Sequence, residues 1–232
     1  MKSLPVSLLS SLFAISATHS AVLSVGALIP DGSSSGLTSV QTLTGMSGSI
    51  QSVTVQLTVS SVGDGAFNGD LYATLQHDSG FAVLLNRPGR TAVDAFGYGD
   101  NGLSVTFDDT GLAPDVHTYR LGGIPVGPLT GTWSSDGRMV DPSVVTEAGP
   151  RTATLSAFNG LDPNGTWILF LADLELGGTA ILDSWDLRID PAPIPEPGLL
   201  ALGTSLGLAA YGLLRGRRRV ADSGTRPATA GL

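Results

Sequence analysis

The stretch Val53-Thr-Val-Gln-Leu-Thr-Val59 decides the fold class of this 232-residue chain. Its odd-numbered positions are apolar and its even-numbered positions are polar. A period of two places successive side chains on opposite faces of a β-strand, so one face of this strand is suited to burial and the other to water. The stretch therefore predicts a sheet that packs one face against a second layer.

Five more stretches predict strands around this one. Alternation recurs in 71–75, 103–107 and 185–189, whereas 81–85 and 167–171 are apolar throughout and are expected to be central strands covered on both faces. Trp167 and Trp185 have the bulk to fill a core. Turn dipeptides lie between the strands, namely Asp64-Gly65, Asn68-Gly69, Ser79-Gly80, Asn101-Gly102, Asp136-Gly137 and Asn164-Gly165. Strands without intervening helices predict an all-β fold, an antiparallel β-sandwich or jelly roll. The Gly- and Pro-rich stretch 119–149 is expected to be a long loop region across one end of it.

Composition excludes several kinds of chemistry. The chain has no cysteine, which excludes disulfides, thiolate metal sites and cysteine nucleophiles. Residues 22–197 contain six Arg, no Lys and 19 acidic residues, a net charge of −13. Nucleic acid is excluded as a partner, because phosphate binding needs a basic face.

The N-terminus has the layout of a secretory signal peptide. Lys2 precedes an apolar stretch that runs from Leu4 to about Ala17, and small residues follow at Ser20 and Ala21. We expect residues 1–21 to be removed by signal peptidase near Ser20 or Ala21. The alternatives are a first strand or a membrane anchor, although the apolar stretch is short for a span.

The C-terminus predicts a membrane-embedded tail. The proline-rich stretch 191–197 favours a stiff, extended linker. Residues 198–214 carry no charge and, as a helix, would span about 25 Å, enough for one transmembrane crossing. The basic cluster and tail, 215–232, would then stay cytoplasmic. The alternative is an ordinary single-pass anchor.

This order of parts resembles the PEP-CTERM sorting signal. The residues that carry the resemblance are the motif Pro195, Glu196 and Pro197, the apolar stretch 198–214, and Arg215, Arg217, Arg218 and Arg219. The resemblance implies recognition and processing by an exosortase, a membrane protease-transpeptidase. It also implies a bacterial protein that is transiently anchored in the inner membrane and then reaches the envelope, outer surface or extracellular matrix. The tail after Arg219 is longer than is usual for such signals.

The body, residues 22–190, is similar to the P domain of subtilisin-like proprotein convertases. A first block carries Gly69-Asp70-Leu71, Leu75, Asp78-Ser79-Gly80 and Leu84-Leu85, and a second carries Phe158-Asn-Gly160, Asn164-Gly-Thr-Trp167, Leu169, Asp173, Gly177 or Gly178, Leu182, Trp185 and Leu187. The resemblance implies a β-sandwich without catalytic residues of its own. The proline that usually follows the serine is absent at Ser79-Gly80, and the central part matches poorly.

The sequence contains no recognisable catalytic motif. The body has two histidines and no Gly-x-Ser-x-Gly elbow. His77 is expected to be solvated in a turn, and His117 to make a loop contact. We therefore expect a non-catalytic surface or matrix protein. A hydrolase with an unrecognised site is one alternative, and a cleft that joins either histidine to Asp or Ser would favour it.

Two kinds of binding site are predicted. Carboxylates in turns, Asp70 and Asp173 among them, predict one low-affinity calcium site, because calcium takes oxygen ligands and some P domains bind calcium. The competing interpretation is a solvated acidic surface. Tyr72, Tyr98, Tyr119 and Trp133 lie outside the predicted core and are candidates for an exposed aromatic platform. Such a platform would favour a second alternative, a carbohydrate- or peptide-binding module, with extracellular polysaccharide as a possible partner.

Overall fold

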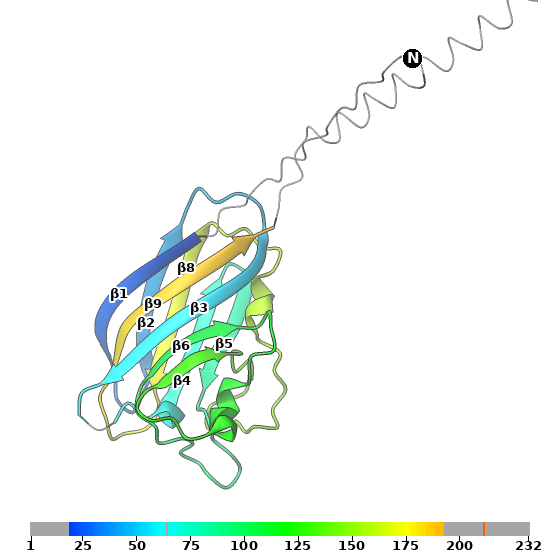
Figure 1. Ribbon diagram of the computed structural model, residues 1–232. Coiled ribbons are helices and arrows are strands. Elements are labelled where there is room, and N and C mark those ends of the chain that lie inside the picture. The colour runs from blue at the N-terminus through cyan, green and yellow to red at the C-terminus, as the bar shows by residue number, and fades with distance from the viewer. Residues whose placement is uncertain (1–18, 64, 193–210, 212–232) are drawn as a thin grey trace, which may run out of the picture. The chain divides into compact units, whose positions relative to one another are not determined.

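Two β-sheets pack face to face in a computed structural model that describes residues 19–63, 65–192 and 211 (Figure 1). The five-stranded sheet has the order β1-β9-β3-β6-β7 and the four-stranded sheet the order β2-β8-β4-β5. The strands are β1 (His19–Ile29), β2 (Ser33–Leu43), β3 (Ile50–Ser61), β4 (Leu71–His77), β5 (Gly80–Asn86), β6 (Leu103–Asp108), β7 (Leu129–Trp133), β8 (Gly165–Asp173) and β9 (Ala180–Pro191). Every pair is antiparallel except β6 and β7. The predicted all-β sandwich is confirmed.

The six strands expected from sequence patterns all form. β3 lies between β9 and β6, and its alternating residues Val53, Val55, Leu57 and Val59 are buried in the core. Trp167 on β8 and Trp185 on β9 are also fully buried, one from each sheet. The period of two thus selected the buried face of each strand correctly, since alternate side chains must point to opposite sides of a sheet.

β5 is not the central strand that its apolar sequence predicts. It is the edge of the four-stranded sheet. The chain that follows β7 covers this edge, because Val83 N–H donates to the Ala153 carbonyl and Asp136 N–H donates to the Leu84 carbonyl. Covering an edge strand with a loop satisfies its free backbone groups and permits an apolar sequence there.

The stretch 119–149 also differs from the prediction of a long loop across one end. It completes the 3-10 helix η2 (Val116–Gly122), contains β7, and then runs along β5. The other 3-10 helices, η1 (Asn68–Asp70) and η3 (Leu155–Phe158), lie in the connections β3–β4 and β7–β8.

β1 and β2 were not predicted. β1 pairs with β9, and it begins at His19, inside the predicted signal peptide 1–21, whose boundary stays a prediction. β2 pairs with β8 after an irregularity between Ser33 and Leu37. Gly36 lies there with φ +54°, and a Cβ at this position would meet the Leu171 carbonyl oxygen at 2.3 Å. A run of serines around such a glycine has no strand signature of its own.

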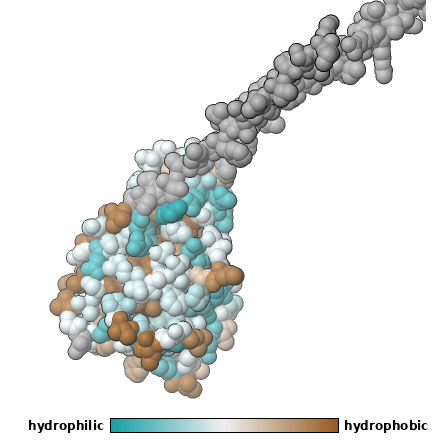
Figure 2. Space-filling view, viewed as in Figure 1, coloured by the Kyte–Doolittle hydropathy of each residue, from teal (hydrophilic) through white to brown (hydrophobic). Residues whose placement is uncertain are grey.

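Both ends of the domain lie at one end of the sandwich, here called the terminal end. His19 at the start of β1 pairs with Ile189 near the end of β9, and Ile50 at the start of β3 pairs with Pro191 (Figure 1). The connections that follow β1, β3, β5 and β8 lie at the opposite end, called the far end. Figure 2 shows exposed apolar side chains on this face of the molecule, several of them toward the far end.

Trp167→Ala is expected to lower the free energy of unfolding by about 3–5 kcal/mol, because it empties a core site. The indole is 0% exposed, contacts the Phe158 ring at a centroid distance of 5.0 Å, and donates a hydrogen bond to the Pro163 carbonyl. Chemical denaturation measures the change. Thr166→Ala, at the exposed neighbouring position, is the matched control and should change stability by less than about 0.5 kcal/mol. An unchanged stability of Trp167→Ala would contradict the core assignment.

Candidate functional site

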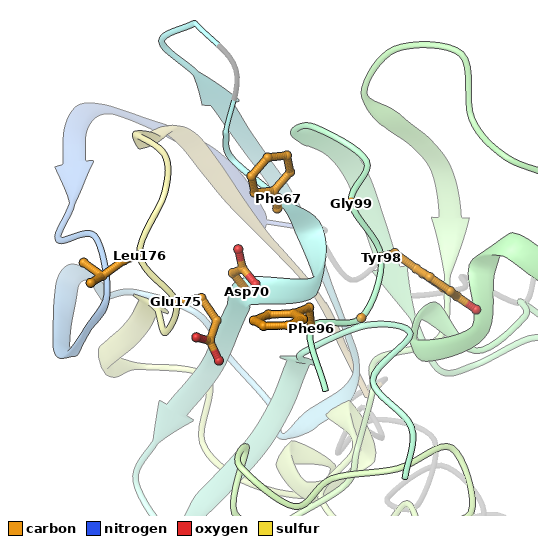
Figure 3. Close-up of a pocket in the computed structure, with 8 residues that line it drawn as sticks. Phe67, Asp70, Phe96, Tyr98, Gly99, Glu175 and Leu176 are labelled. Carbon is orange, nitrogen blue, oxygen red and sulfur yellow. The ribbon is translucent and has the colours of Figure 1, made fainter. Parts of the chain in front are cut away.

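A pocket of about 240 Å³ opens at the far end and is called the far-end pocket. It is lined by Phe67, Asp70, 96–99, Glu175 and Leu176, which come from the β3–β4, β5–β6 and β8–β9 connections. Figure 3 shows the Asp70 side chain between the rings of Phe67 and Phe96, with Glu175 and Leu176 on the neighbouring connection. Three segments far apart in the sequence therefore build one concave site.

Backbone hydrogen bonds hold the walls of the far-end pocket together. Gly69 N–H donates to the Tyr98 carbonyl at 2.8 Å, and Tyr98 N–H donates to the Pro88 carbonyl at 2.9 Å. A Cβ on Gly69 would lie 2.3 Å from the Phe96 carbonyl oxygen, so only glycine allows the two segments to approach so closely. The Asp94 carboxylate accepts hydrogen bonds from the backbone N–H groups of Phe96 and Gly97. The pocket is thus formed before any ligand arrives.

The structure brings the two predicted metal ligands close together: Asp70 lines this pocket, and Asp173 lies on the neighbouring strand. Asp70 ends η1 and Asp173 ends β8, and Asp173 pairs with Leu71, the residue after Asp70. Arg87 is buried beside them. Its Nη2 lies 2.8 Å from Glu175 Oε1 and 3.8 Å from Asp70 Oδ1. Asp173 is 2% exposed, and its Oδ1 has no hydrogen-bond partner among the residues that the structure describes.

Burial makes both carboxyl groups weak acids. Desolvation raises the pKa of Asp70 to about 6, although the positive charge of Arg87 opposes the shift. Desolvation, followed by the negative charge of Asp70, raises the pKa of Asp173 to about 7. Asp31 and Glu175 add further negative charge and raise both values. A pair of this kind holds a proton near neutral pH and binds positive charge more strongly as the pH rises.

The calcium site stays a prediction. The described part of the chain contains no group of three or more His, Cys, Asp or Glu side chains arranged to hold a metal ion. Calcium takes six to eight oxygen ligands, more than the carboxylates of Asp70 and Asp173 alone provide.

The predicted aromatic platform does not form. Tyr119 is 1% exposed and belongs to the core, so its placement outside the core is wrong. Tyr98 and Trp133 are half-buried and pack edge-on against it, with ring centroids at 4.7 Å and 6.1 Å from the Tyr119 ring. Tyr72 is half-buried against Phe170. Sequence reasoning missed Phe67 and Phe96, the aromatic rings that do line the far-end pocket, because no local pattern marks them.

Neither histidine of the body has a free ring nitrogen. His77 is buried rather than solvated, which corrects the prediction, and it stacks on Trp167 at 4.0 Å. Its Nδ1 and Nε2 lie 3.0 Å and 2.7 Å from the carbonyl oxygens of Thr166 and Asp162. His117 is fully buried as a structural contact, with Nδ1 at 2.8 Å from Asp136 Oδ2 and Nε2 at 3.1 Å from the Arg90 carbonyl oxygen. A general base must reach the substrate proton that it removes, and neither ring is placed to do so.

The predicted sorting tail lies outside the residues that the structure describes. This applies to Pro195, Glu196 and Pro197 and to Arg215, Arg217, Arg218 and Arg219. Within the described ranges no helix is long and apolar enough to cross a membrane.

Comparison with known proteins returns distant structural neighbours alone. No protein-family model and no curated protein matches the chain. Among solved structures it is similar to the serine protease of Aeromonas sobria, with 15% identity and a TM-score of 0.41, and to the complex of that protease with its chaperone, with 15% identity and a TM-score of 0.40. The match covers 77% of this chain but only 28% and 27% of those chains. A likeness this distant assigns no activity here.

Asp173→Asn is expected to stabilise the protein at pH 8 by roughly 2 kcal/mol, a benefit that disappears near pH 4. The folded-state pKa of about 7 lies above the ordinary value of 3.8. The folded state therefore keeps a proton that the unfolded state releases, and stability falls as the pH rises from about 4 through 7. Asparagine resembles the protonated carboxyl and removes this loss. Chemical denaturation between pH 4 and pH 8 measures it.

Asp141→Asn is the matched control for this experiment. Hydrogen bonds from Ser143 lower the pKa of Asp141, so its replacement should give no stabilisation at pH 8. Equal pH profiles for the wild type and Asp173→Asn would show that the Asp173 carboxyl is not perturbed.

Proposed function

We propose that this chain is an exported, non-catalytic protein of the bacterial cell envelope or extracellular matrix. In this proposal residues 1–21 are a signal peptide, 22–190 a P-domain-like β-sandwich, and 191–197 a linker that carries the PEP motif. Residues 198–214 are a transmembrane helix, and 215–232 form the basic cluster and cytoplasmic tail. Exosortase and signal peptidase are the processing enzymes.

The observation that carries the proposal is the pairing of β1 with β9. It runs from His19–Ile189 to Ile29–Ala180 and brings the beginning and the end of the sandwich to the same terminal end. A signal peptide that ends at residue 21, within the first residues of β1, and a sorting tail after β9 would both join the domain there. Removing residues 1–21 would take only the first three residues of β1, which pair with Leu187–Ile189, and would leave the pairing of β1 with β9 from Val22 onward.

The burial of both histidines, with their ring nitrogens in contact with protein oxygens, supports a non-catalytic role. Both ring nitrogens of His77 and of His117 face oxygen acceptors inside the domain. The all-β sandwich agrees with the P-domain resemblance, which implies a module without catalytic residues.

A binding module is the second candidate, and the far-end pocket is the observation that favours it. The pocket is concave, has aromatic and charged lining residues, and opens at the end of the sandwich opposite the linker attachment. A domain attached at its terminal end can present such a site to its surroundings.

Replacing Pro195, Glu196 and Pro197 with alanine is expected to leave the unprocessed chain in the inner membrane. The reason is that the processing enzyme would lose its recognition motif. Cell fractionation followed by intact mass spectrometry of the product measures both location and cleavage.

Replacing Pro193 with alanine is the control, since it changes the linker but keeps the motif. This variant should be processed like the wild type. A wild-type product that keeps Arg215–Arg219 and extends to Leu232 would contradict processing near the motif.

A further inference from the structure

The far-end pocket exposes apolar surface on both sides of a carboxylate. Phe96 is 68% exposed and Leu176 is 82% exposed, and the two residues flank Asp70 from different connections (Figure 3). Phe67 supplies a second, half-buried ring. The Tyr98 ring takes no part, because it points away and packs against Tyr119 (Figure 3). Apolar side chains that cluster at a concave site, as Phe96, Leu176 and Phe67 do, are typical of an interaction site.

The charges at this place do not balance. Arg87 forms ion pairs with Asp70 and Glu175. Asp31 and Asp173 lie near enough for their negative charges to repel that of Asp70. Once they are ionised, one positive charge therefore stands against four negative ones. Within the described part of the chain, Asp173 Oδ1 has no hydrogen-bond partner, and Arg87 Nη2 makes its ion pairs without a hydrogen bond. Added positive charge at the mouth of the pocket would relieve this repulsion.

We propose that the far-end pocket binds a lysine or arginine side chain of a partner polypeptide. The cationic head would lie against the carboxylates of Asp70 and Glu175, and the apolar stem against Phe96 and Leu176. Aromatic faces attract organic cations, and a ring beside a carboxylate serves both parts of such a side chain. A cavity of about 240 Å³ has room for one head group and its stem. The inference goes beyond sorting and does not rest on it.

Other ligand classes fit less well. An acidic polysaccharide or nucleic acid would meet a body with a net charge of −13 over residues 22–197. A neutral sugar could stack on Phe96 but would leave the charge excess in place. The observations therefore favour a basic peptide.

The experiment uses the full chain in detergent micelles and the peptide acetyl-Gly-Gly-Lys-Gly-Gly-amide, together with its arginine counterpart. Ligand-observed NMR titration is expected to give millimolar affinity at pH 8. The norleucine peptide, which has the same stem without the charge, should bind at least tenfold more weakly.

Three variants locate the interaction. Phe96→Ala and Glu175→Gln should each weaken binding at least fivefold. Val93→Ala is the matched control, since Val93 is 97% exposed on the same connection but outside the pocket, and it should bind like the wild type. Unfolding curves of all three establish that they are folded.

Two results would overturn the proposal. One is equal binding of the lysine and norleucine peptides, or binding that Phe96→Ala and Glu175→Gln leave unchanged. The other is full displacement of the peptide by millimolar calcium but not by sodium at the same ionic strength, which would assign the carboxylates to a metal ion. Neither result bears on processing of the tail, so failure here is distinguishable from failure of the sorting proposal.

Discussion

Apolar contact between the inner faces of the two sheets is the constraint on which the rest of the domain depends. The chain has no cysteine, so no disulfide contributes to holding the sheets together. Trp185 on β9 shows how specific the contact is, because its indole N–H reaches across the core and donates to Ser39 Oγ on β2 at 2.9 Å. A buried indole needs a hydrogen-bond partner, and this one sets the position of one sheet over the other.

This packing allows the far end to carry unfavourable features. Asp70, Asp173 and Arg87 are all buried there, and desolvation raises the pKa of both carboxyls. Burying charged groups costs free energy unless they are well paired. A domain has only about 5–15 kcal/mol of net stability, so such a cluster persists only where the core offsets its cost.

The two ends of the sandwich differ in what they can do. The terminal end joins the domain to residues 1–21, which we propose to be a signal peptide, and to the segment after Ala192, which we propose to be a sorting tail. The far end holds the exposed Phe96, the acid pair and the pocket. The cause is the antiparallel pairing of β1 and β9, which places the start of the first strand next to the end of the last strand. The two proposals, attachment through the tail and binding in the pocket, therefore involve different ends of the sandwich.

The sequence by itself determined the fold class and six of the nine strands. Each prediction used the residues of a single segment: an alternating pattern for β3, β4, β6 and β9, and a continuous apolar run for β5 and β8. The period of two is a local property that any strand with one buried face must have. The same reasoning correctly assigned Trp167 and Trp185 to the core.

Only the tertiary structure decided sheet order, edges and the site. β5 has the apolar sequence of a central strand but is an edge strand. Its edge is covered by a segment more than forty residues away in the sequence, and no pattern within β5 can indicate such a cover. His77 is buried because the Trp167 ring stacks on it. Tyr119, in the β6–β7 connection, is buried because the Tyr98 ring of the β5–β6 connection packs against it. The sequence singled out Asp70 and Asp173 but not the Phe67, Phe96 and Arg87 that surround them. Phe67 comes from the β3–β4 connection, and Arg87 and Phe96 come from the β5–β6 connection. Long-range strand pairing, which no local pattern encodes, brings these connections together.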